Sequence, residues 1–204
     1  IHERLVGSEM CIRDRQGRGG PMKLLPFIHL SDQRLTDQLG DASETIESFE
    51  QTMAQMDRQW QSDLVRVAKL PISLPLNGSF HVTSHYGLRA DPITGFPSLH
   101  EGIDFVAPVG QSVVATAPGV VVRSEVAGAY GQMIDVQHAE GYTTRYAHLS
   151  QRHVNVGEPV QRGQKLGALG NTGRSTGPHL HYEILKNGRA LNTRKAWPVI
   201  DRAG

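Results

Sequence analysis

The chain has 204 residues, of which 38% are hydrophobic and 20% charged, with a formal net charge of +1 and one cysteine. This is enough apolar material for one domain with an appendage, and the dispersed charges exclude the basic stripe of a nucleic-acid-binding protein. The single cysteine excludes an internal disulfide framework and a cysteine-rich zinc site, so a bound metal must be held by histidine and carboxylate ligands.

The first segment, residues 1–21, is expected to be a non-native or disordered leader, and no function is assigned to Cys11. The run M-K-L-L-P-F-I-H-L from Met22 is not a signal peptide, because its apolar stretch is short and contains a proline. Since the chain begins with Ile1, we expect any membrane anchor to lie in a missing N-terminal segment.

Residues 22–70 are predicted to form an α-helical stem. Apolar residues recur there at alternating spacings of 4 and 3, the pattern of a coiled-coil seam; they are Leu35, Leu39, Ala42, Ile46, Phe49, Met53, Met56 and Trp60. Two interpretations stay open. The helix packs on its own domain, or the segment 35–67 serves self-association or partner docking.

Prolines end the predicted helix. Pro71 and Pro75 cannot continue it and restrict the residues that precede them. We therefore expect a linker over 71–78 and a second domain over 79–198.

The second domain is predicted to be an antiparallel β-sheet, which makes the chain mainly β with an α+β organisation overall. Its apolar runs are short, glycine and proline turns separate them, and no ten-residue helical pattern intervenes. Asn187-Gly188 is typical of a tight hairpin turn. The expected strands are Ser112–Ala115, Gly119–Val126, Gln132–His138, Thr143–His148, Lys165–Leu169 and His179–Leu185.

Two histidines in G-P-H-L-H-Y-E, His179 and His181, are one residue apart in a predicted strand. Side chains of a strand alternate between faces, so both imidazoles lie on one face and Leu180 and Tyr182 on the other. The earlier motif L-H-E-G-I-D-F offers His100 and Asp104. Catalytic zinc sites use three such ligands and keep a position for water, whose pKa falls to about 7. His100, Asp104 and His181 are therefore the candidate metal ligands.

Two further histidines are candidates for acid–base catalysis beside the metal. His179 precedes His181 on the same strand face, and His148, in T-R-Y-A-H-L-S, ends another predicted strand. An imidazole gains and loses a proton in the range that such a reaction needs. His138 and His153 are interpreted as structural histidines.

Five motifs occur in the order found in one protein family: S-H-Y-G-L-R-A-D-P, H-E-G-I-D-F-V-A-P, Y-A-H-L-S, G-N-T-G-R-S-T-G and G-P-H-L-H-Y-E. Over residues 78–195 the chain resembles the lysostaphin-like (M23, LytM-type) zinc metallopeptidases. The resemblance implies one Zn²⁺ per chain on His100, Asp104 and His181, with catalytic support from His148 and His179. It also implies a groove on a β-sheet for an extended peptide of bacterial peptidoglycan.

One departure from the family concerns a tyrosine that some members place before the first ligand as an oxyanion donor. This chain has Phe96 in that stretch, so His148 is the expected second donor. Arg89 and Asp91 are expected to pair and brace the loop before His100, and His85 to line the groove. The loop 170–177 is interpreted as a turn in the groove wall.

We therefore expect a zinc-dependent endopeptidase that hydrolyses peptide cross-links of peptidoglycan, with metal-activated water and two assisting histidines. The alternative is a non-catalytic cell-wall-binding module that activates another wall hydrolase. A third reading, a biotinyl-type carrier, would need a modified lysine such as Lys165. The expected location is the bacterial cell envelope, periplasmic or membrane-anchored. Diamino-acid cross-links and oligoglycine bridges both stay open as the cleaved bond, and the helical stem favours the former.

Overall fold

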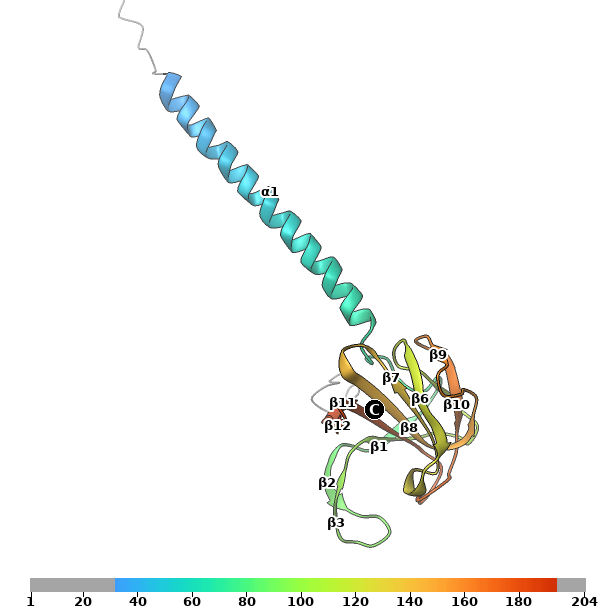
Figure 1. Cartoon of the computed structure of the whole chain (residues 1–204). Helices are drawn as coiled ribbons and strands as arrows, with labels where there is room; N and C mark the ends of the chain where they lie inside the picture. Colours follow the sequence, from blue (N-terminus) through green and yellow to red (C-terminus); the bar gives the residue numbers. More distant parts are fainter. Residues whose placement is uncertain (1–31, 194–204) are drawn as a thin grey trace, which may run out of the picture. The chain divides into compact units, whose positions relative to one another are not determined.

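The computed structural model describes residues 32–193 (Figure 1). The predicted leader, the start of the predicted stem at 22–31 and the predicted domain end at 194–198 lie outside this range. No helix among the described residues combines the length and the apolar character that crossing a bilayer requires.

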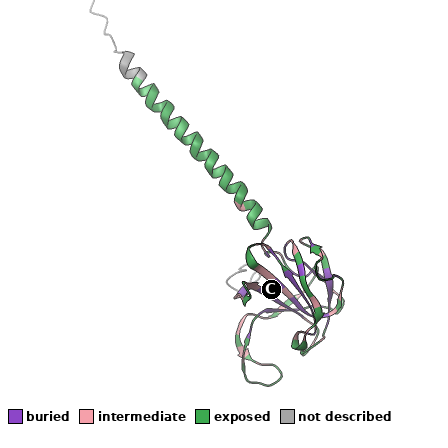
Figure 2. Ribbon diagram, viewed as in Figure 1, coloured by how far each residue is buried: buried purple, intermediate pink, exposed green. Residues whose placement is uncertain are grey.

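Helix α1 runs from Asp32 to Ala68 and accounts for the described part of the predicted stem. The seam side chains that the structure describes are exposed (Figure 2); their exposed fractions are 50–66% for Leu39, Ile46, Phe49, Met53, Met56 and Trp60. The described helix up to Asp57 belongs to one compact unit, and the described chain from Arg58 onward forms another. The use of the seam for self-association or docking stays a prediction.

The remaining described chain forms an antiparallel sheet, which confirms the predicted fold class (Figure 1). Its main path runs β1 (His81–Ser84), β4 (Ile103–Val106), β11 (Leu180–Lys186), β8 (Tyr142–Arg152), β7 (Gln132–Gln137), β6 (Gly119–Val126) and β9 (Pro159–Val160). Off this path, β10 (Lys165–Leu169) pairs with β5 (Ser112–Val114) and β8, and β12 (Arg189–Ala190) pairs with β11. A separate hairpin consists of β2 (Gly87–Ala90) and β3 (Pro97–His100). Short 3-10 helices cover Gly128–Tyr130 and Ala139–Gly141.

The core of the sheet unit lies on the face that the alternation of β11 predicts. Leu180 and Tyr182 are fully buried there, opposite the histidine face. Phe105 packs on Tyr182 with ring centroids 6.4 Å apart. Thr116 links the hydroxyls of Tyr146 and Tyr182 by hydrogen bonds of 3.1 and 3.0 Å, so the buried phenols are not left without partners.

The predicted linker packs against the sheet unit. Pro71, Pro75 and Leu76 are buried, and Leu76 forms an isolated bridge with Val113. The Pro75 carbonyl accepts a bond of 2.9 Å from the Val114 N–H. The domain boundaries themselves stay predictions.

Candidate functional site

The side chains of His100, Asp104 and His181 converge, although the chain separates them by up to 81 positions. The register of the sheet brings them together: Asp104 on β4 is the direct cross-strand neighbour of His181 on β11, and His100 ends β3 just before β4. Asp104 Oδ1 lies 2.9 Å from His181 Nδ1 and 3.1 Å from His100 Nε2, and these two nitrogens are 3.1 Å apart. Ligands of a tetrahedral zinc ion lie about 3.4 Å apart, so the set fits such an ion with small adjustments.

The outer nitrogen of each of these two imidazoles is bonded to an acceptor. His100 Nδ1 donates to the His85 carbonyl at 2.9 Å, and His181 Nε2 donates to Glu183 Oε1 at 2.9 Å. When both rings are neutral, the inner nitrogens, His100 Nε2 and His181 Nδ1, are then left with lone pairs that point at Asp104. Three acceptors in mutual contact repel one another unless a cation lies between them. The donor set therefore suits a metal ion on chemical grounds.

The electrostatics of the site also favour a positive charge. Burial alone lowers the pKa of His181, but its hydrogen bonds to Asp104 and Glu183 outweigh burial and raise it to about 9. Without a metal ion, a proton on Nδ1 therefore supplies the positive charge between His181 and Asp104. Burial opposes the ionised form of Asp104, yet the contacts with His100 and His181 hold the pKa of this carboxyl well below its usual value. The carboxylate is thus charged at neutral pH.

A row of charged residues behind His181 was not given a role by the sequence analysis. Asp135 on β7, Arg145 on β8 and Glu183 on β11 are successive cross-strand neighbours. Arg145 forms two bonds to Asp135, of 2.9 and 3.0 Å, and one of 3.1 Å to Glu183. Tyr130 donates to Glu183 at 2.9 Å. The sequence did contain one indication of this contact: Glu183 follows His181 by two residues, and residues i and i+2 of a strand lie on the same face.

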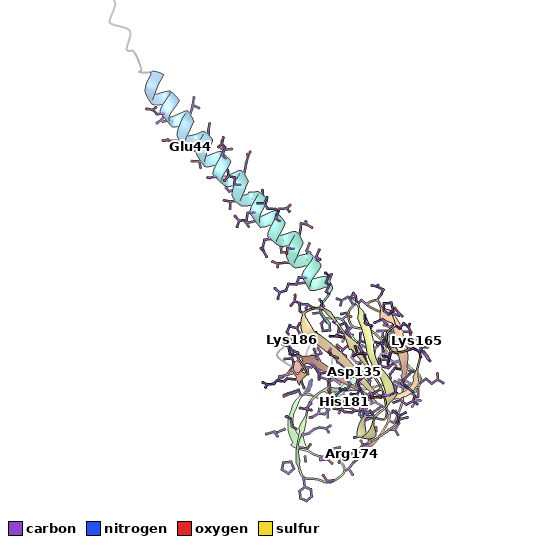
Figure 3. The ribbon with its side chains drawn as sticks, viewed as in Figure 1. Glu44, Asp135, Lys165, Arg174, His181 and Lys186 are labelled. Atoms are coloured by element: carbon purple, nitrogen blue, oxygen red, sulfur yellow. The ribbon has the colours of Figure 1, made fainter. Side chains whose placement is uncertain are left out.

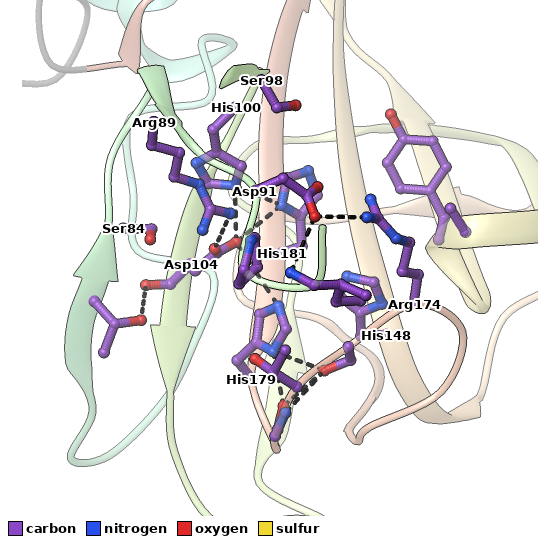
Figure 4. A pocket seen from close by; sticks show the side chains of 18 of the residues that line it. Ser84, Arg89, Asp91, Ser98, His100, Asp104, His148, Arg174, His179 and His181 are labelled. Atoms are coloured by element: carbon purple, nitrogen blue, oxygen red, sulfur yellow. Dashed lines mark hydrogen bonds and ion pairs between the residues drawn. The ribbon is translucent and has the colours of Figure 1, made fainter. Parts of the chain in front are cut away.

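His148 and His179 lie beside the three converging side chains (Figure 4). Their ring centroids are 4.7 Å apart, and His179 Nε2 is 3.8 Å from Asp104 Oδ1. His148 Nδ1 donates to the Thr172 carbonyl and His179 Nδ1 to the Gly177 carbonyl, both at 2.8 Å. Within the described chain, neither ring has a hydrogen bond at Nε2. Burial, the largest influence, lowers the pKa of His148 to about 4, so this imidazole is neutral at neutral pH.

His148 has a backbone φ of 59°. This left-handed conformation costs a residue with a side chain free energy, and it is frequent at functional sites. The strand register explains it, because the two residue steps of β7 from Gln132 to Ile134 face the three residue steps of β8 from Tyr146 to Leu149. The resulting bulge re-aims His148 and lets β8 continue to Arg152, past the predicted strand end.

Close backbone approach at the site requires a glycine at position 102. A Cβ there would lie 2.7 Å from both His181 Cε1 and the Tyr182 carbonyl oxygen. The glycine in L-H-E-G-I-D-F thus lets the turn before β4 pass directly under His181.

The five candidate residues share one cavity of about 550 Å³. The loop 170–177 contributes Arg174, Ser175, Thr176 and Gly177 to its wall, as the sequence analysis expected. His85 is not among the lining residues, and only its carbonyl oxygen contributes, through His100. His138 and His153 also lie outside the cavity and bond to Thr144 and Gln151.

The expected pair of Arg89 and Asp91 is wrong. Arg89 lies on the half-buried face of β2 and donates to Asp104 Oδ2 at 3.3 Å. Asp91 instead accepts a hydrogen bond of 2.7 Å from Arg174. Both contacts join segments that are distant in the chain, so the sequence spacing gave no signal for them.

Comparison with known proteins agrees with this geometry. The model of peptidase family M23 matches residues 98–193. The chain is 42% identical over 123 residues to the peptidoglycan DD-endopeptidase ShyA of Vibrio cholerae serotype O1, covering 60% of this chain and 29% of the relative. A zinc-containing peptidase from Vibrio cholerae superposes with a TM-score of 0.55 and 38% identity, over 58% of this chain and 37% of that one.

The catalytic domain of lysostaphin from Staphylococcus simulans superposes with a TM-score of 0.53 and 31% identity, and the match covers 57% of this chain and 91% of that domain. The first curated relatives are much longer, since the matched regions span only 24–29% of their lengths. The match in family model, sequence and fold shows that this chain belongs to peptidase family M23.

Proposed function

We propose that the protein is a zinc-dependent endopeptidase that cleaves peptide cross-links of bacterial peptidoglycan. The observation that carries the proposal is the convergence of His100 Nε2, Asp104 Oδ1 and His181 Nδ1, with the outer nitrogens of both imidazoles bonded to fixed acceptors. Family membership and the names of the relatives, which include peptidoglycan DD-endopeptidases, support the substrate class.

In this proposal, His100, Asp104 and His181 hold one Zn²⁺. A zinc ion at such a site supplies Lewis acidity and lowers the pKa of water to about 7. The bonds to the His85 carbonyl and to Glu183 keep both ligand rings in the tautomer that presents a lone pair.

His148 and His179 are proposed to move the protons. Both rings are anchored through Nδ1–H, so each neutral ring presents Nε2 as an acceptor. Either ring can accept a proton from the attacking water and then, as an imidazolium, donate it to the leaving amine. Because the Nδ1–H of His148 is bonded to the Thr172 carbonyl, its Nε2 can donate to an oxyanion only after this nitrogen has accepted a proton. The sequence suggested His148 as an oxyanion donor, and the structure restricts that role to the protonated ring.

The proposed substrate lies in the bacterial cell envelope, so we propose that the protein acts there, in the periplasm or from a membrane anchor. We also propose that residues 35–67 serve self-association or docking on a partner. The Lys165 side chain is exposed at the start of β10 (Figure 3). It lies outside the cavity that holds the five candidate residues, and nothing there favours a carrier.

The test is incubation of the zinc-loaded full chain with cross-linked muropeptides, followed by mass analysis of the products. We expect cleavage that a chelator abolishes and added zinc restores. His181→Ala should lose zinc and activity together. His148→Ala should keep zinc and lose on the order of 10²- to 10⁴-fold in turnover.

The result that contradicts this proposal is a zinc-loaded protein that binds muropeptides and cleaves none of them. That outcome would favour the alternative, a wall-binding module that activates another hydrolase. Loss of zinc in His148→Ala would instead show that the ligand set is assigned wrongly.

A further inference from the structure

Arg174 is a cation in the cavity wall that the proposed mechanism does not use. It lies in the loop between β10 and β11, and its side chain is 46% exposed. Among the described residues, the only other arginine or lysine that lines the cavity is Arg89, which is bonded to Asp104. Arg174 is thus the cavity cation that has no bond to a candidate metal ligand.

The side-chain partner of Arg174 is Asp91, in the turn between β2 and β3 (Figure 4). Asp91 Oδ1 also accepts from the Ile93 N–H, the Thr94 N–H and the Thr94 hydroxyl, at 3.0, 2.9 and 3.1 Å. These hydrogen bonds hold the pKa of Asp91 well below its usual value, and the bond from the Thr94 N–H has the largest effect. The carboxylate therefore keeps three donors when the guanidinium leaves, so breaking the pair orphans no acceptor.

Arg174 has donors to spare. A guanidinium carries five N–H groups in a fork that fits a carboxylate with two bonds. Within the described residues, only the bond from Nη2 to Asp91 engages this side chain. The backbone is held independently, because the Arg174 N–H donates to the Ala129 carbonyl at 2.8 Å. The side chain can therefore change partners while its loop stays in place.

We propose that the guanidinium of Arg174 binds a carboxylate of the substrate. In the free protein, Asp91 holds the guanidinium in place of that carboxylate. The proposal deepens the peptidase function above and rests on it. A cross-link made by a diamino dicarboxylic acid has a free carboxylate beside the amide nitrogen that is cleaved, whereas lysine and oligoglycine bridges have none there. Arg174 thus selects the first class of cross-link.

The experiment uses two synthetic cross-linked peptides that are identical except at the carbon beside the scissile nitrogen, which bears either a carboxylate or a carboxamide. With the zinc-loaded full chain we expect kcat/KM to favour the acid by on the order of 10- to 100-fold. Arg174→Gln should bring this ratio close to 1, and Arg174→Lys should restore part of it. Asp91→Asn keeps an oxygen acceptor for the turn and should lower KM for the acid, because the competing charge is gone.

Arg189→Gln is the matched control. Arg189 is exposed on β12 and lies outside the cavity, so its loss should leave the ratio unchanged. Equal cleavage of both peptides by the unmodified protein, or a preserved ratio in Arg174→Gln, overturns the role of Arg174 and leaves the peptidase assignment standing.

The two proposals can fail separately. If the zinc-loaded protein cleaves neither peptide, the peptidase assignment fails, and calorimetric titration of the same two peptides still decides on Arg174. Tighter binding of the acid that Arg174→Gln abolishes supports the carboxylate site. Equal affinities overturn it.

Discussion

At the scale of single residues, each of the four imidazoles in the cavity is held through one nitrogen and offers the other. Their anchors are the carbonyls of His85, Thr172 and Gly177 and the carboxylate of Glu183. Glu183 differs from the other anchors because it is charged and fully buried, with Arg145 and Tyr130 as its further partners. It is therefore the anchor whose removal should affect the metal most.

Glu183→Gln should weaken zinc binding by about 10- to 100-fold, the usual effect of losing an outer partner of a ligand histidine. The amide keeps the volume but removes the charge that orients the Nε2–H of His181. Competition with a chromogenic chelator measures the affinity, and Glu125→Gln on the exposed face of β6 is the control. An unchanged zinc affinity would show that Glu183 acts only in packing.

His148 permits a test of backbone strain. His148→Gly and His148→Ala both remove the imidazole, but only glycine adopts a φ of 59° without a steric cost. We expect the glycine variant to be more stable than the alanine variant by about 1 kcal/mol. Urea denaturation of both variants measures the difference, and equal midpoints would mean that the bulge relaxes.

At the scale of elements, the sequence predicted strands where apolar residues dominate and missed them where polar site residues interrupt. The expected bounds of β6 and β10 agree with the structure. By contrast, β1, β2, β3 and β4 were not predicted, because they are four residues long and two of them carry His100 and Asp104. Asn187 and Gly188 both have positive φ and join β11 to β12, which confirms the predicted turn.

The site was predictable in composition but not in its supporting contacts. Motif spacing and strand alternation indicated which histidines share a face. Register decides which residues of different strands become neighbours, and the residue pattern within each strand does not reveal the register between strands that are distant in the chain. For this reason Asp135–Arg145–Glu183 and Arg174–Asp91 became visible only in the fold.

The C-terminal end of α1 has a specific attachment to the sheet unit. Arg162 donates to the carbonyls of Ala68 and Leu70 at 2.9 Å and to that of Thr116 at 2.8 Å. Arg66 forms a more exposed pair with Glu140. Three bonds to backbone acceptors from one half-buried guanidinium should matter more than one exposed ion pair.

Arg162→Met should therefore lower the free energy of unfolding by about 2 kcal/mol. Arg66→Met should lower it by clearly less, since water screens an exposed pair. Urea denaturation of the chain from Arg58 onward reports both values. A larger effect of Arg66→Met would reverse the assignment of the main attachment.

At the scale of the whole molecule, the start of the independently stable unit can be located by truncation. A chain from Arg58 should melt at the same temperature as the sheet unit of the full chain, because it keeps the Arg162 and Arg66 contacts. A chain from Pro71 should fold with a lower melting temperature. A chain from Ser79 also loses buried Leu76, which should cost a further 2–5 kcal/mol or so. Equal melting of all three would place the boundary at 79.

The exposed seam of α1 predicts a difference in association state. In a pure sample, the exposed seam of α1 can pack only against the same helix of a second copy of the chain. We therefore expect the full chain to self-associate as its concentration rises, and the chain from Arg58 to sediment as a monomer. Ile46→Glu with Phe49→Glu should abolish the association. A full chain that stays monomeric at high concentration would instead favour docking on a different partner.

The pairing of Asp104 with His181 across β4 and β11 has a consequence for how the protein acquires its metal. If the two strands paired one residue out of register, Asp104 or His181 would point to the opposite face of the sheet. The three ligands therefore come together only when β4 and β11 pair in the native register. During refolding, zinc binding should therefore appear in the same kinetic phase as the pairing of β4 with β11. The loss of free zinc, followed with a fluorescent zinc indicator, would measure the rate of that single folding event.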